Sequence, residues 1–529
     1  MLSSESATAT DGDSELPHQS DESFIESRSE RSTDDLRNTA LAADRYGVSD
    51  RATAAIVNGF QLDIGRIGEG NTQHVVDHKK VQRARHSARE READSRKEQH
   101  SGLTGLYFDG RKDTSFIMVD NSAGSSSRTS RLEEHIAVVA EPGSQYLTHF
   151  TPESGKAHAI YKELQSVVEE YGGDIVVIGA DGTAVNTGRH GGVCRLFELL
   201  RDKPVHWFIC QLHSNELNLR ELFTRLDGVT TGPKSFSGPL GKKLAKDIER
   251  EPVVSFQAIP GNIPELEPEI LKDLSTDQEI LYRLAVGVTS GNVPSELSAR
   301  KFGPLNMARW LTLAARTLRL YVSTAQPSEQ LRTLAEFIVV HYVPMWFEIK
   351  RNPHCKNGSK NLFRSVELLR DLPVSVQSII RPAIERNGYW AHPEAILLAI
   401  LADTDETVSQ QAVTMIKKCR QEANGDLRSY QLPAINFAAK HYTQLIDWSK
   451  ECITEPPLTL SLGETDLQSA GRQTPCYPVH TQAVERAVQL VTQAASAVVG
   501  ERARHGYICA RLQHRALMPV FESKRDFRF

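Results

Sequence analysis

Apolar residues between positions 103 and 212 follow a pattern that predicts a series of strands and helices. Short apolar runs bounded by Gly, Asp and Pro are typical of strands, and apolar residues three and four positions apart are typical of helices. The third run, 135–150, contains a turn signal at Pro142-Gly143. The pattern predicts strands at 103–109, 114–120, 135–150, 174–181 and 205–212, and helices at 154–173 and 191–201.

This order, β-β-β-α-β-α-β, is that of a ribonuclease-H-like mixed sheet, in which the first and fourth strands lie side by side at the centre. From about 265 to 380 the apolar spacing changes to that of helices, and further helices are predicted at 391–403, 412–423 and 480–500. We therefore expect an α/β fold: a ribonuclease-H-like sheet interrupted by a large all-helical insertion, with helical N- and C-terminal parts.

The N-terminal hundred residues differ from the rest in composition. Residues 1–37 hold ten acidic and three basic residues, so we expect a disordered tail. Residues 38–60 predict two short helices broken near Gly47, either a helix-turn-helix or, more simply, a helical pair without a DNA role. Residues 79–98 hold eight Lys or Arg against four acids, which predicts a solvated helix or linker, or else a phosphate contact or nuclear import signal.

At 529 residues the chain is too long for one compact core. The composition shifts predict six parts along it. They are a disordered acidic tail (1–37), a small helical region with a basic linker that could contact DNA (38–100), the first part of the core (101–225), the helical insertion (226–380), a return to the core (381–450), and a Pro-rich linker with a C-terminal helix (451–529).

Charge and cysteine usage narrow the class of protein. The formal net charge of −5 gives no argument for nucleic acid, so any basic binding surface has to be local. The seven cysteines are widely spaced without a Cys-x-x-Cys pair, which favours reduced thiols in an intracellular protein. The N-terminus has no signal-peptide pattern and no apolar run is long enough to span a membrane, so we expect no membrane partner.

Two aspartates follow apolar runs of the predicted sheet. Asp109 ends the first predicted strand and Asp181 ends the fourth. If these strands are neighbours, both carboxylates emerge at one edge of the sheet, where α/β sites form. Hard divalent ions such as Mg²⁺ or Mn²⁺ prefer such oxygen ligands. An Asp-Gly pair after a strand is also a common turn, so the prediction depends on the two aspartates together.

Six segments carry a resemblance to known proteins: LYFDGRKD, ADGTAVNTGRHGG, HWFICQLHSNELNLRELF, LDGVTTGPKSFSGPLGKKL, ARWLTLAARTLRLYV and AHPEAILLAILAD. They resemble a family of uncharacterised, transposon-derived proteins of invertebrate genomes, which is similar in turn to the hAT superfamily of transposases. The family-level resemblance covers most of 38–529, and the hAT-level resemblance covers mainly 103–225 and 380–405. The resemblance implies a metal-dependent Asp-Asp-Glu core that acts on DNA in the nucleus.

The resemblance assigns roles to further residues. Asp109 and Asp181 match the first two acids. Cys210-x-x-His213 matches a hAT signature, for which we expect a structural role because no second Cys/His pair completes a zinc site. Arg309-Trp310 resembles the Arg-Trp motif of the hAT insertion.

The third acid is less clear. The hAT pattern favours Glu385, whereas the closer family favours Glu394, which we choose narrowly. A surface glutamate stabilised at a helix N-terminus is an equally plain interpretation of either residue. The chain also lacks the zinc-binding BED finger of active hAT enzymes, since its first cysteine is Cys194. Recognition of transposon ends would have to come from 38–100 or the insertion, or be lost.

We therefore expect a transposase-like protein that cleaves or joins DNA phosphodiester bonds with Mg²⁺ or Mn²⁺ held by Asp109, Asp181 and Glu394. The alternative is a catalytically inactive, domesticated DNA- or protein-binding protein with the same fold. A ribonuclease-H-like exonuclease is less attractive, because it needs a fourth acid nearby and leaves the insertion unexplained. The predicted partner is DNA, no small-molecule substrate is expected, and the C-terminal helix predicts self-association.

Overall fold

The computed structural model describes residues 35–99, 102–120, 126–232, 235–246, 251–305, 309–471 and 473–517. They form two compact units, one made of the described residues up to Glu90 with Ala510–Leu517, and the other of those from Arg91 to Cys509. The predicted disordered tail lies outside the described residues, apart from its last three. Among the helices of the described ranges, none has the length and apolar character that a membrane crossing requires.

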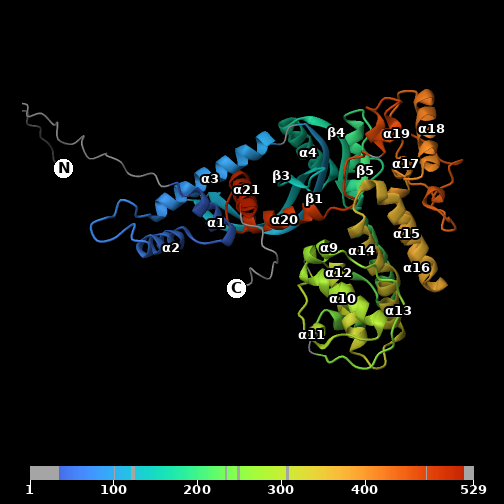
Figure 1. The fold of residues 1–529 in the computed structure, drawn as a ribbon, viewed down its shortest axis with the longest axis horizontal. Coiled ribbons are helices and arrows are strands. Elements are labelled where there is room, and N and C mark those ends of the chain that lie inside the picture. Colours follow the sequence, from blue (N-terminus) through green and yellow to red (C-terminus); the bar gives the residue numbers. More distant parts are fainter. Residues whose placement is uncertain are drawn as a thin grey trace, which may run out of the picture. The chain divides into compact units, whose positions relative to one another are not determined.

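The larger unit contains a five-stranded mixed sheet with the strand order β3-β2-β1-β4-β5 (Figure 1). β1, β2 and β3 pair antiparallel, whereas β4 and β5 run parallel to β1. The predicted contact between the first and fourth strands is confirmed, and the topology is compatible with a ribonuclease-H-like core. The strands are β1 (Leu103–Asp120), β2 (Ser126–Glu141), β3 (Gln145–Phe150), β4 (Gly173–Ala180) and β5 (His206–Ile209).

The first two predicted strands are a single strand in the structure. β1 continues through the polar residues 110–113 because it pairs with β2 along its length, from Gly105 opposite Glu141 to Asp120 opposite Ser126. The predicted third strand is instead divided into β2 and β3 at Pro142-Gly143. The prediction that Asp109 ends a strand is therefore wrong, since Asp109 lies within β1.

The two faces of the sheet are covered by different helices. On one face, Leu106 and Phe108 of β1 pack in a core with residues of α4 (Ala157–Tyr171) and α6 (Val193–Leu199). On the other face, α20 (Gln482–Ala495) packs against β1 and β2 and buries Val484, Val488 and Val491. Because side chains alternate along a strand, Asp109 lies on the face opposite Phe108, the face that α20 covers.

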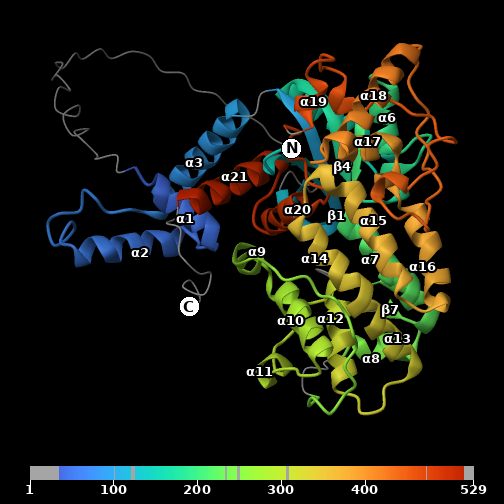
Figure 2. The same cartoon turned by 45° about the vertical axis from the view of Figure 1, so that its right-hand side comes forward.

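The remainder of the larger unit is mostly helical. Both views show α10, α12 and α13 grouped together, and α7, α12 and α13 are in contact (Figures 1 and 2). A short hairpin, β6 (Thr230–Gly232) and β7 (Ser235–Phe236), was not predicted. The other helices are α5 (Ala184–Thr187), α7 (Gln211–Asp227), α8 (Pro239–Leu244), α9 (Pro268–Asp273), α10 (Thr276–Ser290), α11 (Ser295–Ser298), α12 (Arg309–Val322), α13 (Glu329–Phe337), α14 (Val343–Arg351), α15 (Gly358–Arg370), α16 (Val374–Arg386), α17 (Pro393–Leu401), α18 (Glu406–Glu422) and α19 (Leu467–Ala470).

The smaller unit contains the two predicted N-terminal helices, α1 (Arg37–Tyr46) and α2 (Asp50–Asp63), together with the first part of α3 (His78–Gln99) and the end of α21 (Glu501–Leu517). Ser49 caps α2 by accepting a hydrogen bond from the Ala52 N–H at 3.2 Å. Two basic residues of α3 are used within this unit, because Arg85 and Arg89 pair with the buried carboxylate of Asp44. They are consequently less available for a phosphate contact than the exposed basic residues of α3.

The close contact between β1 and β4 gives a test of the sheet. A Cβ atom on Gly179 of β4 would lie 2.4 Å from the ring of Tyr107 of β1, which is only 1% exposed. We expect Gly179→Ala to lower the free energy of unfolding by about 1–3 kcal/mol, because the ring cannot move aside in a packed core. Urea unfolding checks this, with Gly191→Ala as the control, since a Cβ there meets nothing within 4 Å. Equal stability of the two variants would contradict the pairing.

Candidate functional site

The parallel pairing of β1 and β4 brings Asp109 and Asp181 together. The last paired residues of the two strands are Tyr107 and Gly179, and each aspartate lies two residues further along its own strand direction. Both line one cavity of about 410 Å³. Asp109 thus reaches the predicted place although β1 does not end there, because β4 ends there.

Two more carboxylates, Glu216 and Glu485, line the same cavity. Glu216 is in α7, which follows β5, and Glu485 is in the first turn of α20. The rest of the lining comes from β1, α7 and α20, and from the helices α10, α12 and α14. The other lining residues are Gly110, Arg111, Leu212, His213, Gln278, Leu311, Trp346, Thr481, Gln482, Val488 and Gln489.

Local donors hold one oxygen of three of these carboxylates. The Gly110 N–H donates to Oδ1 of Asp109 at 2.8 Å. Oδ1 of Asp181 accepts from the Thr183 hydroxyl at 2.8 Å and from the Asn186 amide at 2.6 Å. Oε1 of Glu485 accepts from the hydroxyl of Thr481 at 2.8 Å. Each of these bonds comes from a residue one to five positions away, so each side chain is oriented by its own strand end or helix turn.

The pKa values of Asp109, Glu216 and Glu485 are all raised, partly by neighbouring carboxylates. Burial raises the pKa of Asp109 well above its usual range, and the charges of Glu485 and Asp181 raise it further. Burial raises the pKa of Glu485 despite the Thr481 hydrogen bond, and Asp181 adds to the rise. Burial, with the charge of Glu485, raises the pKa of Glu216 to about 8.

Four carboxylates and the guanidinium of Arg111 line the cavity. Among the described residues, no Lys or Arg forms an ion pair with any of the four carboxylates, although Arg486 has a weaker influence on Glu485. Carboxylate oxygens are the ligands that Mg²⁺ and Mn²⁺ prefer, so the donor set fits a divalent cation. In the described ranges, however, no group of three His, Cys, Asp or Glu side chains is arranged to hold a metal ion.

Cys210 and His213 support the cavity from the start of α7. The Cys210 sulfur accepts from the N–H of His213 at 3.5 Å and from the N–H of Thr481 at 3.4 Å. It therefore connects α7, which carries Glu216, to the turn that precedes α20. Burial lowers the pKa of His213, while the nearby charge of Asp181 opposes that shift. Trp310, the second residue of the predicted Arg-Trp motif, is buried edge-on against Phe223 at 6.1 Å.

The structure does not bring Glu394 to this cavity. Glu394 is 2% exposed in α17, where both its oxygens contact Arg428 and Oε1 also accepts from the Thr454 hydroxyl at 2.7 Å. Arg428 pairs in turn with the fully buried Glu198 at 2.6 Å. A carboxylate neutralised in this way ties α17 to α6, and no cation is needed to balance it. Glu385 is exposed near the end of α16 and also lies outside the cavity lining.

Sequence reasoning missed Glu485 and Glu216. The amphipathic pattern of residues 480–500 predicts a helix with one buried face. It does not predict the surface against which that face packs. One signal was available, since Glu485 is the only acidic residue of α20 and adjoins its apolar stripe. Glu216 follows the Cys-x-x-His signature by three residues, which is one helical turn and places it on the same face as His213.

Comparison with known proteins does not assign this chain to a family. No protein-family model and no curated protein matches the chain. Among solved structures, a chain of the Drosophila P element transposase strand transfer complex is 13% identical, with 90% of this chain and 92% of that chain aligned at a TM-score of 0.27. A TM-score this low supports no conclusion about fold or function.

The ion cluster around Glu394 gives a stability test. We expect Glu394→Ala to lower the free energy of unfolding by about 3–5 kcal/mol, because it leaves the buried Arg428 with one partner fewer. Glu385→Ala is the control and should change stability by less than about 0.5 kcal/mol, since its side chain is exposed. Urea unfolding of both variants measures the difference. A loss below about 1 kcal/mol at Glu394 would show that the cluster does not stabilise α17.

The raised pKa of Glu216 predicts a pH-dependent stability. Its pKa rises from 4.5 to about 8 on folding, so the stability that it contributes is complete below pH 4.5 and is lost as the pH rises through 8. Glu216→Gln should therefore match the wild type near pH 4.5 and exceed it near pH 9 in urea unfolding with EDTA present. Glu221→Gln, on the exposed side of α7, should show no such difference. An equal gain at both pH values would contradict the shift.

Proposed function

We propose that this chain is a transposase-like protein whose acidic cavity binds divalent cations and cleaves or joins DNA phosphodiester bonds. One observation carries the proposal: Asp109 from β1, Asp181 from the end of β4 and Glu485 from α20 line a single cavity. These elements are far apart in sequence, and nothing in the stability of the sheet requires carboxylates at their meeting point. A strand pair and a covering helix that each contribute an acid match the Asp-Asp-Glu arrangement which the family resemblance implies.

In this proposal the third acid is Glu485 and not Glu394. Glu485 interacts electrostatically with both Asp109 and Asp181. Asp109, Asp181 and Glu485 would hold Mg²⁺ or Mn²⁺. Such an ion activates a water or a 3′-hydroxyl and stabilises the leaving oxygen when it is bound.

The protein's own groups orient the ligands. Thr183, Asn186 and Thr481 hold one oxygen of Asp181 or Glu485 and leave the second oxygen of each carboxylate for a cation. Cys210 accepts hydrogen bonds from both α7 and the turn before α20, so it connects the two elements that carry Glu216 and Glu485. Glu216 is available as a fourth oxygen ligand or as a proton carrier beside the reacting phosphate.

DNA is the proposed partner and the nucleus the proposed location. Lys79 and Arg83 are exposed on α3, and we propose that they contact phosphates. Self-association stays a prediction, but it needs a surface other than the apolar face of α20, since β1 and β2 already cover that face.

A catalytically inactive DNA- or protein-binding protein is the second candidate. The observation that favours it is the arrangement of the acids, no three of which are placed to hold one metal ion among the described residues. In that case the carboxylates would stay apart and partly protonated. The two candidates differ in whether the cavity binds a divalent cation.

Calorimetric titration with Mn²⁺ and a DNA-nicking assay test the proposal together. We expect Asp181→Asn and Glu485→Gln each to reduce Mn²⁺ affinity and Mn²⁺-dependent cleavage by more than about 100-fold, beyond the effect usual for residues that only support a ligand. Glu385→Gln, an exposed glutamate, is the matched control and should leave both unchanged. Mn²⁺ binding that survives Glu485→Gln would exclude Glu485 as the third acid. DNA binding by a wild-type protein that binds no Mn²⁺ would favour the inactive candidate.

A further inference from the structure

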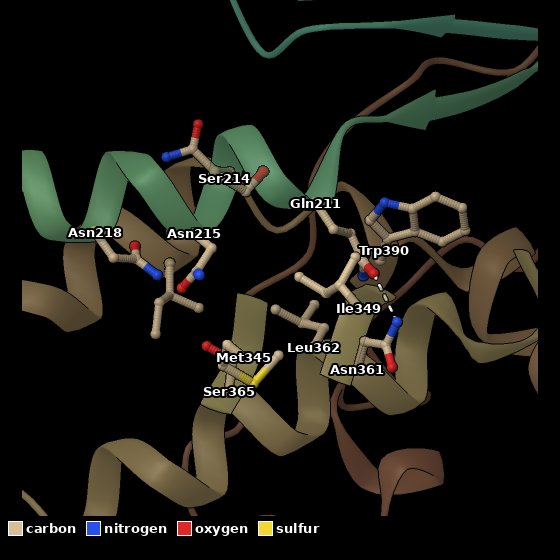
Figure 3. Close-up of a pocket in the computed structure, with 12 residues that line it drawn as sticks. Gln211, Ser214, Asn215, Asn218, Met345, Ile349, Asn361, Leu362, Ser365 and Trp390 are labelled. Atoms are coloured by element: carbon tan, nitrogen blue, oxygen red, sulfur yellow. Dashed lines mark hydrogen bonds between the residues drawn. The ribbon is translucent and has the colours of Figure 1, made fainter. Parts of the chain in front are cut away.

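A second, smaller cavity lies on the other side of α7. It has a volume of about 40 Å³ and is lined by α7, α14, α15, the end of α16 and the segment around Trp390 (Figure 3). Four of the side chains that line it are buried amides. Gln211, Asn215, Asn218 and Asn361 all line it and are between 3% and 6% exposed.

Part of this polar wall is satisfied by the protein itself. The Gln211 amide donates to the Gly358 carbonyl at 2.6 Å and accepts from Asn361 at 3.0 Å. The Asn215 amide nitrogen donates to the Tyr342 carbonyl at 2.9 Å. These bonds join α7 to α15 and to the start of α14.

Two hydrogen-bond acceptors of this cavity have no partner among the described residues. The amide oxygens of Asn215 and Asn218 are buried and accept no hydrogen bond from the protein. Figure 3 shows both side chains extending from α7 toward α14. Rotating the Asn215 amide by half a turn would only exchange the groups, because its nitrogen would then lose the Tyr342 carbonyl. Buried polar atoms of this kind are normally bonded to ordered water.

The size of the cavity fits water and little else. A buried water needs roughly 10–15 Å³ of such volume, so the site has room for about three or four molecules. Met345, Ile349 and Leu362 are apolar parts of the lining, whereas Ser214 and Ser365 add further polar groups.

We propose that this cavity is a water site in which ordered waters donate to Asn215 and Asn218, and that the hydrated face of α7 keeps His213 and Glu216 in position on its opposite face. The spacing supports this, since residues 211, 214, 215 and 218 form one stripe of the helix and 212, 213 and 216 form another. Asn215 and Asn218 are positioning residues, because they act on the acidic cavity only through α7. The positioning role rests on the proposed function, whereas the water site does not.

A crystal structure of the full chain, at a resolution that shows ordered water, tests the site directly. We expect water within hydrogen-bond distance of Oδ1 of both Asn215 and Asn218. Well-ordered walls without water density, or amide oxygens bonded to protein groups instead, would overturn the water site.

Two variants test the positioning role. Asn218→Leu has nearly the same shape but no hydrogen-bonding group, so it should expel the water that Asn218 holds. Asn218→Ser keeps a hydroxyl and leaves room for water, and it is the matched control. We expect the leucine variant to shift the imidazole NMR signal of His213, assigned by its loss in His213→Gln, and to weaken Mn²⁺ binding by about 10-fold. The serine variant should leave both near the wild type.

The outcomes separate this proposal from the proposed function. If the wild type binds no Mn²⁺, the proposed function fails, but the His213 signal and the crystallographic waters still report on α7. If the leucine and serine variants give the same His213 signal while both stay folded, the positioning role is overturned even when Mn²⁺ binds normally.

Discussion

The parallel pairing of β1 with β4 is the constraint on which the candidate site depends. It places two strands distant in sequence side by side, and it ends where β4 ends, so the first residues beyond the pairing face the same space. Asp109 and Asp181 occupy those positions. The helices then complete the site, because α20 lies across β1 and α7 starts just after β5. The sheet thus brings two of the four carboxylates together, and the two helices add the other two.

The two groups of acids in the molecule differ in how their charge is balanced. Around Arg428, the carboxylates of Glu198 and Glu394 have a shared cationic partner, so their charge is balanced within the fold. In the cavity, Asp109, Glu216 and Glu485 have no such partner among the described residues, and their pKa values rise. The first arrangement stabilises the fold, whereas the second costs folding free energy unless protons or a cation neutralise it. That contrast is the strongest physical sign of which glutamate belongs to the site.

Much of the sheet could be predicted from sequence, whereas the contribution of α20 and Glu485 to the site could not. Apolar runs located β4 and β5 because buried strands are continuously apolar, and the turn at Pro142-Gly143 was visible from its residues. The polar residues between 109 and 114 falsely indicate the end of a strand. β1 continues through them because it pairs with β2 there, although no apolar side chains mark this part of the strand. Glu394 and Glu485 each lie in the first turn of a helix, so local sequence could not distinguish them. Only long-range packing shows that one meets Arg428 and the other meets the sheet.

The alternation of side chains along β1 also limits how this protein can change in length over evolution. Substitutions between Gly105 and Asp109 would alter packing, but an insertion or deletion of one residue there would turn Asp109 to the face of α4 and α6. The register already shifts between Leu103 and Gly105, so that end of the strand pair accommodates a change in length. Descendants of this sequence should therefore gain and lose residues before Gly105 and keep the four-residue step to Asp109 unchanged.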